Sequence, residues 1–304
     1  MNALTIQNLY KTYPQGVKAL EGVDLQIKQG DFFGLLGPNG AGKSTIIGII
    51  TGLVTKTSGK VQIMHYDIDA NFTQARQLIG IVPQEMNFSI FETVLNIVVD
   101  QAGYYGIPRS IAVQRAEKYL KELGLWEKRD AVSRTLSGGM KRRLMIVRAL
   151  IHEPKILILD EPTAGVDVEL RRGMWDFLVR VNKAGTTIVL TTHYLEEAEQ
   201  LCHTIAIINK GIIIENTSKK NLLAKLESQT YLLDIKGTIK DVPAVSDFVL
   251  RLMDENTLEV DLKSKQTLTM LLSALAEQKV EVLSARAKSN RLEELFLRFV
   301  EGKQ

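Results

Sequence analysis

The stretch Gly37-Pro38-Asn39-Gly40-Ala41-Gly42-Lys43-Ser44-Thr45 decides how this chain folds. It follows the short apolar run Phe32 to Leu36, which predicts a strand, and it opens a helical stretch from Ser44 to Leu53. A strand, a glycine-rich loop and a helix in this order match the pattern G-x-x-x-x-G-K-[ST]. Glycines allow positive φ, so successive backbone N–H groups can converge on phosphate oxygens. The sequence therefore predicts a site for a nucleoside triphosphate.

In this stretch, the phosphate loop, different residues are expected to bind different parts of the nucleotide. Its backbone N–H groups and the N-terminus of the following helix, which carries a partial positive charge, are expected to face the phosphates. Lys43 is expected to reach the β- and γ-phosphates, and the Ser44 hydroxyl to ligate Mg²⁺. The expected nucleotide-binding residues of the loop are Gly37, Pro38, Asn39, Gly40, Ala41, Gly42, Lys43, Ser44 and Thr45.

A second apolar run ends in two acids, in the sequence Ile156-Leu157-Ile158-Leu159-Asp160-Glu161. A buried parallel strand delivers its last residues to the ligand edge of the sheet. Asp160 is then placed to hold Mg²⁺ through its water shell, and Glu161 to accept a proton from the attacking water. A solvated acidic turn is the alternative, and the phosphate loop upstream favours the catalytic interpretation.

A third motif, Leu136-Ser137-Gly138-Gly139, precedes an apolar-faced helical stretch from Met140 to Ile151. Ser137 and the two glycines predict a second anion-binding helix N-terminus. The basic run Lys141 to Arg143 follows, either to attract a polyphosphate or as a solvated basic turn. The motif lies about 100 residues after the phosphate loop, and one nucleotide does not need both from the same subunit.

Composition excludes several classes of protein. A net charge of +3 fits an ordinary surface, and we expect no nucleic-acid partner. The single cysteine, Cys202, rules out an intrachain disulfide. The first 13 residues lack the features of a secretory signal. The apolar window Ile46 to Val54 is too short to span a bilayer and Ile205 to Ile214 is interrupted, so we expect no membrane crossing.

The remaining pattern predicts a nucleotide-type α/β core and a small second domain. The first ~65 residues indicate strands and turns, residues 84–151 helices, and Ile205 to Glu215 a hairpin turning at Asn209-Lys210-Gly211. After Ser218 the character of the chain changes. There we predict strands at Tyr231 to Ile235, Leu258 to Leu262 and Val280 to Leu283, and helices at Ala244 to Leu252, Thr267 to Glu277 and Arg291 to Val300.

Residues 3–217, with these motifs in this order, resemble the ATP-binding-cassette (ABC) ATPases. The resemblance implies an α/β P-loop fold with an antiparallel β subdomain and an inserted helical subdomain at about residues 86–152, all within a cassette of residues 1–218. It also implies a small C-terminal α+β domain, residues 219–304, that regulates the cassette or supports a dimer. In this family two subunits pair head to tail, and each LSGG motif caps the ATP held by the other's phosphate loop.

The resemblance assigns four further residues. Tyr13, in Lys11-Thr12-Tyr13, matches the aromatic residue that stacks on adenine, and Asp167 matches the loop that signals across the dimer. Gln84 resembles the glutamine that links Mg²⁺ and the attacking water to the helical subdomain, and His193 the histidine that contacts the γ-phosphate. The expected metal ligands are Ser44, Gln84 and Asp160, and the expected catalytic residues are Glu161, His193 and Gln84.

The variant LSGGMKRRL, in which Met140 replaces the family's usual glutamine, is similar to the branch that serves ABC-2-type bacterial exporters of drugs and polysaccharides. The ending Arg291-Leu292-Glu293-Glu294-Leu295-Phe296 resembles that branch as well. The resemblance implies an ATP- and Mg²⁺-dependent ATPase that drives a separate transmembrane permease, for export. It places the chain at the cytoplasmic face of the inner (plasma) membrane, held there by the permease. The partner cassette is expected to be a second copy of this chain.

Two alternatives stay open at this point. An importer subunit has a similar cassette and a different permease. A soluble ABC ATPase acting on ribosomes or DNA is less well supported, since the chain has one phosphate loop and no sustained heptads. The aromatic residues Phe91, Tyr104 and Tyr105 in the helical block either dock a permease helix or pack in the core. The resemblance implies that specificity for the transported molecule resides in the permease.

Overall fold

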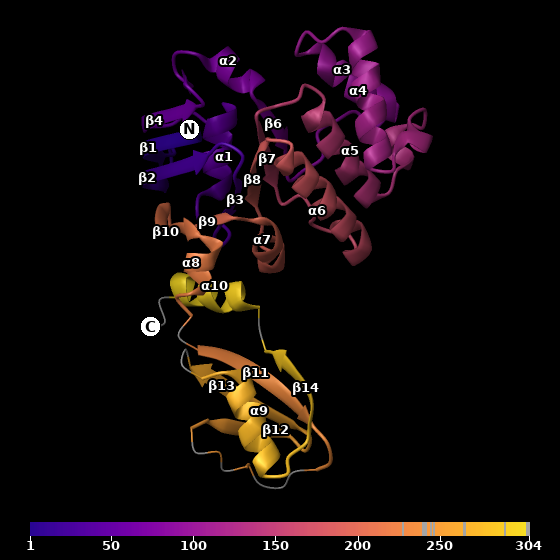
Figure 1. Ribbon diagram of the computed structural model, residues 1–304. Coiled ribbons are helices and arrows are strands. Elements are labelled where there is room, and N and C mark those ends of the chain that lie inside the picture. Colours follow the sequence, from indigo (N-terminus) through magenta and orange to yellow (C-terminus); the bar gives the residue numbers. More distant parts are fainter. Residues whose placement is uncertain are drawn as a thin grey trace. The chain divides into compact units, whose positions relative to one another are not determined.

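The computed structural model describes residues 1–226, 228–238, 242–243, 245, 247–263, 266–288 and 290–301. The chain divides into two compact units, Met1–Ser218 and Lys219–Gln304 (Figure 1). Each unit has its own buried apolar cluster. Because each buries a core of its own, the two units are described separately.

The central sheet of the first unit has the strand order β10-β9-β3-β8-β7-β6. Its parallel strands are β3 (Phe32–Leu36), β6 (Ile79–Val82), β7 (Ile156–Asp160), β8 (Thr187–Thr191) and β9 (Thr204–Asn209). The edge strand β10 (Ile212–Ser218) pairs antiparallel with β9, which confirms the predicted hairpin. Since parallel strands end at one edge, the loops after β3, β6, β7 and β8 meet there.

An antiparallel sheet with the order β2-β1-β4-β5 packs beside the central sheet. It consists of β1 (Asn2–Thr12), β2 (Lys18–Lys28), β4 (Ser58–Ile63) and β5 (Tyr66–Asp67). Alternate residues of β2, such as Val23, Leu25 and Ile27, point into one apolar cluster that also holds side chains from the central sheet and from α1 (Lys43–Thr51). This shared core fixes the position of α1 and hence of the phosphate loop before it.

A group of helices is inserted between β6 and β7 (Figure 1). It contains α3 (Val94–Gly103), α4 (Arg109–Glu122) and α5 (Gly138–Leu150), with short 3₁₀ turns at Trp126–Lys128 and Ser133–Thr135. The unit also has α2 (Phe72–Gln77), α6 (Val168–Lys183) and α7 (Leu195–Leu201). No helix in the described part of the chain is long and apolar enough to span a bilayer.

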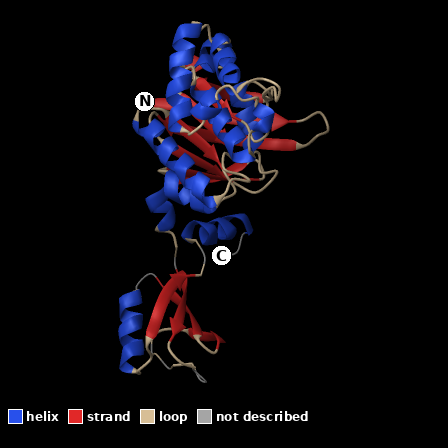
Figure 2. Ribbon diagram, turned by 90° about the vertical axis from the view of Figure 1, so that its right-hand side faces the viewer, coloured by secondary structure: helices blue, strands red, loops and turns tan. Residues whose placement is uncertain are grey.

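The second unit is an antiparallel sheet with helices (Figure 2). Its strands, in the order β12-β13-β11-β14, are β11 (Ser228–Ile235), β12 (Leu250–Asp254), β13 (Thr257–Lys263) and β14 (Val282–Ala287). Its helices are α8 (Lys219–Leu223), α9 (Leu268–Glu277) and α10 (Arg291–Glu301). Leu271 and Leu275 of α9 pack on the sheet residues Leu233, Leu258 and Val260. The α/β P-loop class with a small α+β unit is confirmed.

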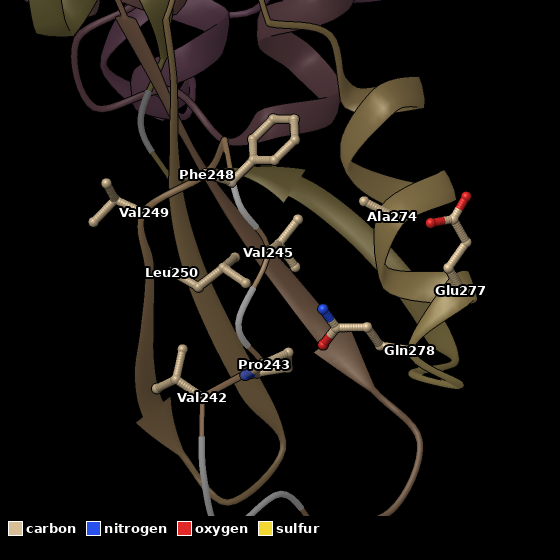
Figure 3. Close-up of a pocket in the computed structure, with 9 residues that line it drawn as sticks. All are labelled: Val242, Pro243, Val245, Phe248, Val249, Leu250, Ala274, Glu277 and Gln278. Carbon is tan, nitrogen blue, oxygen red and sulfur yellow. The ribbon is translucent and has the colours of Figure 1, made fainter.

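Beside α9 the second unit has an open cavity of about 620 Å³. Figure 3 shows the side chains that line it, which are Val242, Pro243, Val245, Phe248, Val249, Leu250, Ala274, Glu277 and Gln278. Most of these residues are apolar, in keeping with a cavity that borders the apolar cluster of this unit.

One predicted element is wrong. The stretch from Ala244 to Leu252 was expected to be a helix, but Val245 and Asp247–Val249 are not helical and β12 begins at Leu250. Leu250 and Leu252 pair with Val260 and Leu258 of β13, so strand pairing outweighs local helical periodicity. Ala244 and Ser246 lie outside the described residues.

Candidate active site

The phosphate loop is held in place by close backbone contacts. A Cβ atom on Gly37 would lie 2.4 Å from the carbonyl oxygen of Ile208, so a larger residue does not fit there. Gly42, the N-cap of α1, has φ of +113°, a conformation that favours glycine. The buried Lys43 folds its Nζ over the loop and donates to the carbonyl oxygens of Gly37 (2.6 Å) and Pro38 (3.0 Å). The loop is therefore preformed around the lysine ammonium.

A cavity of about 380 Å³ lies at this edge of the sheet. It is lined by Ala19, Asn39, Gly40, Ala41, Gly42, Lys43, Ser44, Thr45, Gln84, Asp160 and Glu161. The loops that follow β3, β6 and β7 thus bring most of the phosphate loop, Gln84 and the two acids together. Burial lowers the pKa of Lys43, while the negative charges of Glu161 and Asp160 act against that shift.

The two acids are oriented by the neighbouring strand β8. The Asp160 carboxylate, at the end of β7, accepts a hydrogen bond from the Thr191 hydroxyl. Glu161 adopts a positive φ of +49°, and its N–H donates to the carbonyl oxygen of Thr191 over 2.9 Å. Glu161 Oε2 accepts from Gln84 Nε2, and Oε1 lies near His193 Nδ1, both over 3.1 Å. The Glu161 carboxylate therefore lies between Gln84 and His193, facing the cavity.

His193 is positioned by the turn that follows β8. The hydroxyl of Thr192 accepts a hydrogen bond from the Tyr194 N–H over 2.9 Å, and the His193 ring lies 4.1 Å from the Tyr194 ring. The guanidinium of Arg171, on α6, lies over the Tyr194 ring and donates to the carbonyl oxygen of Val166. The turn with His193 is therefore linked to α6 and to the loop after the acids.

Sequence reasoning missed Glu197, a fully buried acid on α7 behind the site. Its Oε1 accepts hydrogen bonds from the Thr163 hydroxyl and from Trp175 Nε1, each over 3.0 Å. Burial raises the pKa of Glu197, and hydrogen bonds from Thr192, Trp175 and Thr163 oppose that rise. The signal in the sequence is weak, because a glutamate in the first turn of a helix usually faces solvent.

Tyr13 lies beside the phosphate loop. Its hydroxyl is 3.4 Å from the Thr45 hydroxyl, and the Lys11 ammonium lies 4.7 Å from the centre of its ring. The side chain is half-buried, so part of the ring stays available for a stacking partner.

The LSGG motif and Asp167 lie away from this cavity. The Ser137 hydroxyl caps α5 by accepting from the Met140 N–H, and the Asp167 carboxylate caps α6 by accepting from the Leu170 N–H. Ser137, Gly138 and Asp167 are exposed, and neither they nor Gly139 line the cavity of the phosphate loop. The structure thus separates the predicted site residues into one group around the cavity and one on exposed helix N-termini.

Two arginines of the basic run after the LSGG motif make hydrogen bonds within the first unit. Arg142 is buried and donates from Nη1 to the carbonyl oxygen of Pro83 over 2.9 Å. Arg143 donates from Nη1 to the carbonyl oxygen of Leu123 over 2.6 Å. Burial lowers the pKa of both guanidinium groups. Both sequence interpretations, an attractor and a solvated turn, are therefore wrong for the buried Arg142.

The residues around the cavity fit a magnesium nucleotide. The Ser44 hydroxyl, the Asp160 carboxylate and the Gln84 amide supply oxygen atoms, the ligands that Mg²⁺ prefers. Because Gln84 donates its Nε2 hydrogen to Glu161, its amide oxygen remains available. Lys43 and the backbone of the phosphate loop add the donors that a triphosphate needs.

A phosphate loop at the C-terminal edge of a parallel sheet, an acid pair and a separate LSGG motif at an exposed helix N-terminus together define an ATP-binding cassette. The model of the ABC transporter family matches residues 20–164. The linearmycin resistance ATP-binding protein of Bacillus subtilis is 36% identical to this chain over 97% of both chains. This chain belongs to the ATP-binding subunits of ABC transporters, and it is an ATPase.

Further comparisons agree with this assignment. The Nod factor export ATP-binding protein I of Cupriavidus metallidurans is 40% identical over 68% of each chain. The structure of cbiO1 from Clostridium perfringens, part of an ABC transporter complex, superposes with a TM-score of 0.67 at 31% identity and covers 74% of this chain and 91% of that one. A dimeric, post-hydrolysis cassette bound to ADP and Pi has a TM-score of 0.65 at 30% identity, covering 71% of this chain and 98% of that one.

Proposed function

We propose that this chain pairs head to tail with a second copy around two Mg-ATP and drives a separate ABC-2-type permease for export. The observation that carries the proposal is the separation of the two phosphate-binding helix N-termini. One lies in the cavity with Gln84, Asp160 and Glu161, while the other, at Ser137, is exposed and outside that cavity. An exposed anion-binding N-terminus is suited to a nucleotide held by another subunit.

Within each site, this chain's own residues hold the triphosphate in place and accept a proton from the attacking water. The phosphate loop and Lys43 hold the triphosphate, and Tyr13 stacks on the adenine. Glu161 accepts a proton from the attacking water, while Gln84 and His193, its two neighbours, fix its carboxylate. Ser44, Asp160 and Gln84 would hold Mg²⁺, which would offset part of the negative charge on the phosphates. Asp167 signals across the dimer from the start of α6.

The permease contact is proposed at the segment between Gln84 and α4. Met86, Ile90, Phe91 and Tyr104 are exposed there, with Phe91 72% and Tyr104 86% accessible. Exposed apolar side chains gathered in one segment are typical of a protein interface. Tyr105, the third aromatic residue considered, instead stacks on His152 at a centroid distance of 3.7 Å. The names of the two relatives, linearmycin resistance and Nod factor export, support a role in export. We place the chain at the cytoplasmic face of the inner membrane, where the proposed permease would hold it.

Replacing Glu161 with glutamine tests the shared site. The variant should bind Mg-ATP, lose hydrolysis and accumulate as a closed dimer, because only the proton acceptor is removed. Size-exclusion chromatography with saturating Mg-ATP measures the dimer, and the same variant with ADP or with EDTA is the control. A Glu161→Gln protein that binds ATP and remains monomeric would contradict the head-to-tail site.

Identification of co-purifying proteins tests the permease. Purification of the chain from a mild detergent extract of its source should recover an ABC-2-type membrane subunit. A variant with Phe91 and Tyr104 both changed to serine should lose that subunit and keep its ATP binding. Recovery of an importer-type permease, or of ribosomes, would contradict the export proposal.

A further inference from the structure

We propose that Arg142 is a positioning residue that couples the LSGG helix α5 to the chain's own hydrolytic site. This inference rests on the shared-site function proposed above. Arg142 lies in the turn of α5 that follows the LSGG motif, and only 6% of it is exposed. Its Nη1 donates to the carbonyl oxygen of Pro83 over 2.9 Å. The helix that would cap the partner's nucleotide therefore touches the segment that carries Gln84.

The contact continues to the proposed base. Pro83 directly precedes Gln84, whose Nε2 donates to Glu161 Oε2 over 3.1 Å. Two hydrogen bonds and one stretch of backbone thus join α5 to the Glu161 carboxylate. A shift of α5, when its N-terminus engages a nucleotide, would move Pro83 and change how Gln84 holds Glu161.

Electrostatics explains why a buried cation is stable at this position. Removing a guanidinium from water is costly unless opposite charges and hydrogen bonds replace the water. Burial lowers the pKa of Arg142, and the negative charges of Asp160, Glu161 and Glu197 act against it. Arg142 therefore interacts with the acids of the site in two ways, through electrostatic attraction and through its hydrogen bond to Pro83, the residue before Gln84. A neutral side chain of similar length would keep the packing and lose this link.

A second arginine on α5 holds the far end of the same segment. Arg148 Nη1 donates to the carbonyl oxygen of Asn87 over 3.0 Å, and its guanidinium lies over the Phe88 ring. The Ser133 hydroxyl, just before α5, donates to the carbonyl oxygen of Ser89 over 3.0 Å. The segment is thus tied to α5 at several points, and Arg142 holds the end next to Gln84. Arg148 is therefore the matched control.

The test compares Arg142→Gln, Arg142→Lys and Arg148→Gln in steady-state ATP hydrolysis. Arg142→Gln should lower kcat by about tenfold and leave KM for ATP within about twofold, because nucleotide binding stays intact. It should also raise the Mg²⁺ concentration needed for half-maximal rate, since Gln84 is a proposed ligand. Arg142→Lys, which keeps the charge and loses the planar fork, should lose about threefold in kcat. Arg148→Gln should change kcat less than Arg142→Gln.

A purely structural role predicts different results. In that case Arg142→Gln would lower the melting temperature, raise KM and lower kcat together, and Arg148→Gln would do the same. A wild-type kcat in Arg142→Gln overturns the coupling. If Arg142→Gln does not unfold cooperatively, Arg142→Lys decides: reduced kcat at the wild-type melting temperature supports the proposal, and wild-type kcat overturns it.

Dimerisation separates this proposal from the shared-site function. The double variant Glu161→Gln, Arg142→Gln should form the Mg-ATP dimer at the same ATP concentration as Glu161→Gln alone. If Glu161→Gln by itself fails to dimerise, the shared site is wrong. If it dimerises and Arg142→Gln hydrolyses ATP at the wild-type rate, only the coupling is wrong.

Discussion

At the scale of single residues, the backbone of Glu161 places its carboxylate. A non-glycine residue at φ of +49° is uncommon, and such conformations cost about 1–3 kcal/mol. The hydrogen bond from its N–H to the Thr191 carbonyl oxygen holds the turn. The backbone therefore turns away from the direction of β7 at Glu161, and the turn places the carboxylate between Gln84 and His193. The sequence motif predicts the role of this acid as proton acceptor, but it did not predict the backbone turn at Glu161.

Glu197 should contribute to stability through the hydrogen bonds that its carboxyl accepts from Thr163 and Trp175. Glu197→Ala leaves the Thr163 hydroxyl and Trp175 Nε1 without their acceptor, and each buried donor left unpaired costs about 1–3 kcal/mol. The variant should therefore melt several degrees lower. Glu197→Gln keeps an acceptor oxygen and should retain near-wild-type hydrolysis. Differential scanning calorimetry and ATPase assays measure both, and equal losses in the two variants would contradict this role.

Because the pKa of Glu197 is raised in the folded protein, its contribution to stability should decrease as the pH rises. Above its ordinary pKa of 4.5 the unfolded chain has released a proton that the folded chain still holds. The contribution of this group to stability is therefore full below pH 4.5 and is lost as the pH rises toward the folded pKa. Glutamine does not titrate, so the melting temperature of Glu197→Gln relative to wild type should increase from pH 5 to pH 8. A difference that stays constant would mean that the carboxyl titrates normally.

At the scale of elements, the N-terminus of α5 should tolerate a charge in the monomer and reject it in the dimer. A Cβ atom on Gly138 would meet nothing within 4 Å, so Gly138→Asp should leave the melting temperature and ATP binding unchanged. Its carboxylate would repel the partner's triphosphate, so Glu161→Gln, Gly138→Asp should fail to dimerise with Mg-ATP. Gly37→Ala is the contrasting control, because its Cβ would lie 2.4 Å from the Ile208 carbonyl oxygen. A Gly138→Asp dimer of normal stability would remove the LSGG motif from the shared site.

The junction between α5 and β6 should be sensitive to acid. His152, just after α5, contacts the Ile79 carbonyl oxygen through Nε2 over 3.0 Å, and burial lowers its pKa from 6.5 to about 4. Its contribution to stability is therefore full above pH 6.5 and is lost as the pH falls from 6.5 toward 4. His152→Phe, which keeps a ring on Tyr105, should lose less stability between pH 7.5 and pH 5 than wild type in urea unfolding. His65→Phe, at an exposed histidine, is the control, and equal losses in wild type and His152→Phe would contradict the prediction.

The elements that sequence reasoning predicted well are those with a strong local signal. β3 matches the predicted strand residue for residue, because it is a short apolar run bounded by turns. β6 was not predicted, because a run of four residues that contains a glycine is a weak strand signal, and the pairing with β7 that completes it lies far away in the sequence. Glycine is required at position 80 of β6 because of a contact with another element. A Cβ atom there would lie 2.3 Å from the carbonyl oxygen of Ala149 on α5. Pairing and close approach between elements cannot be read from a single segment.

The same limit applies to the site. Motif spacing led to the phosphate loop, Asp160 and Glu161, and the structure gathers these residues around one cavity with Gln84. Arg142 and Glu197 were missed as neighbours of the site, because charged residues on helices are mostly exposed and only the tertiary fold shows that these two are buried.

At the scale of the whole molecule, the described part of each unit has a buried apolar cluster, and the proposed nucleotide site lies in the first unit. The unit Met1–Ser218 holds every residue proposed to bind or hydrolyse ATP, and its core joins both of its sheets. The unit Lys219–Gln304 has a separate apolar cluster around Leu233, Leu258 and Leu271. A unit with its own core can in principle be removed without unfolding the other. The second unit is therefore best tested by its deletion.

Deletion of residues 219–304 should separate nucleotide binding from dimer formation. Residues 1–218 alone should unfold cooperatively and bind ATP with wild-type affinity, because the cavity and its supporting core are complete in that unit. We propose that the second unit supports the dimer. The Glu161→Gln cassette without it should then need about threefold or more ATP to dimerise, as lost dimer contacts must be offset by nucleotide binding. Calorimetry, nucleotide titration and size-exclusion chromatography measure the three quantities on the same samples. Unchanged dimerisation would contradict a role in the dimer and would favour a role of this unit in permease binding or regulation. Loss of ATP binding would mean that the two units do not fold independently.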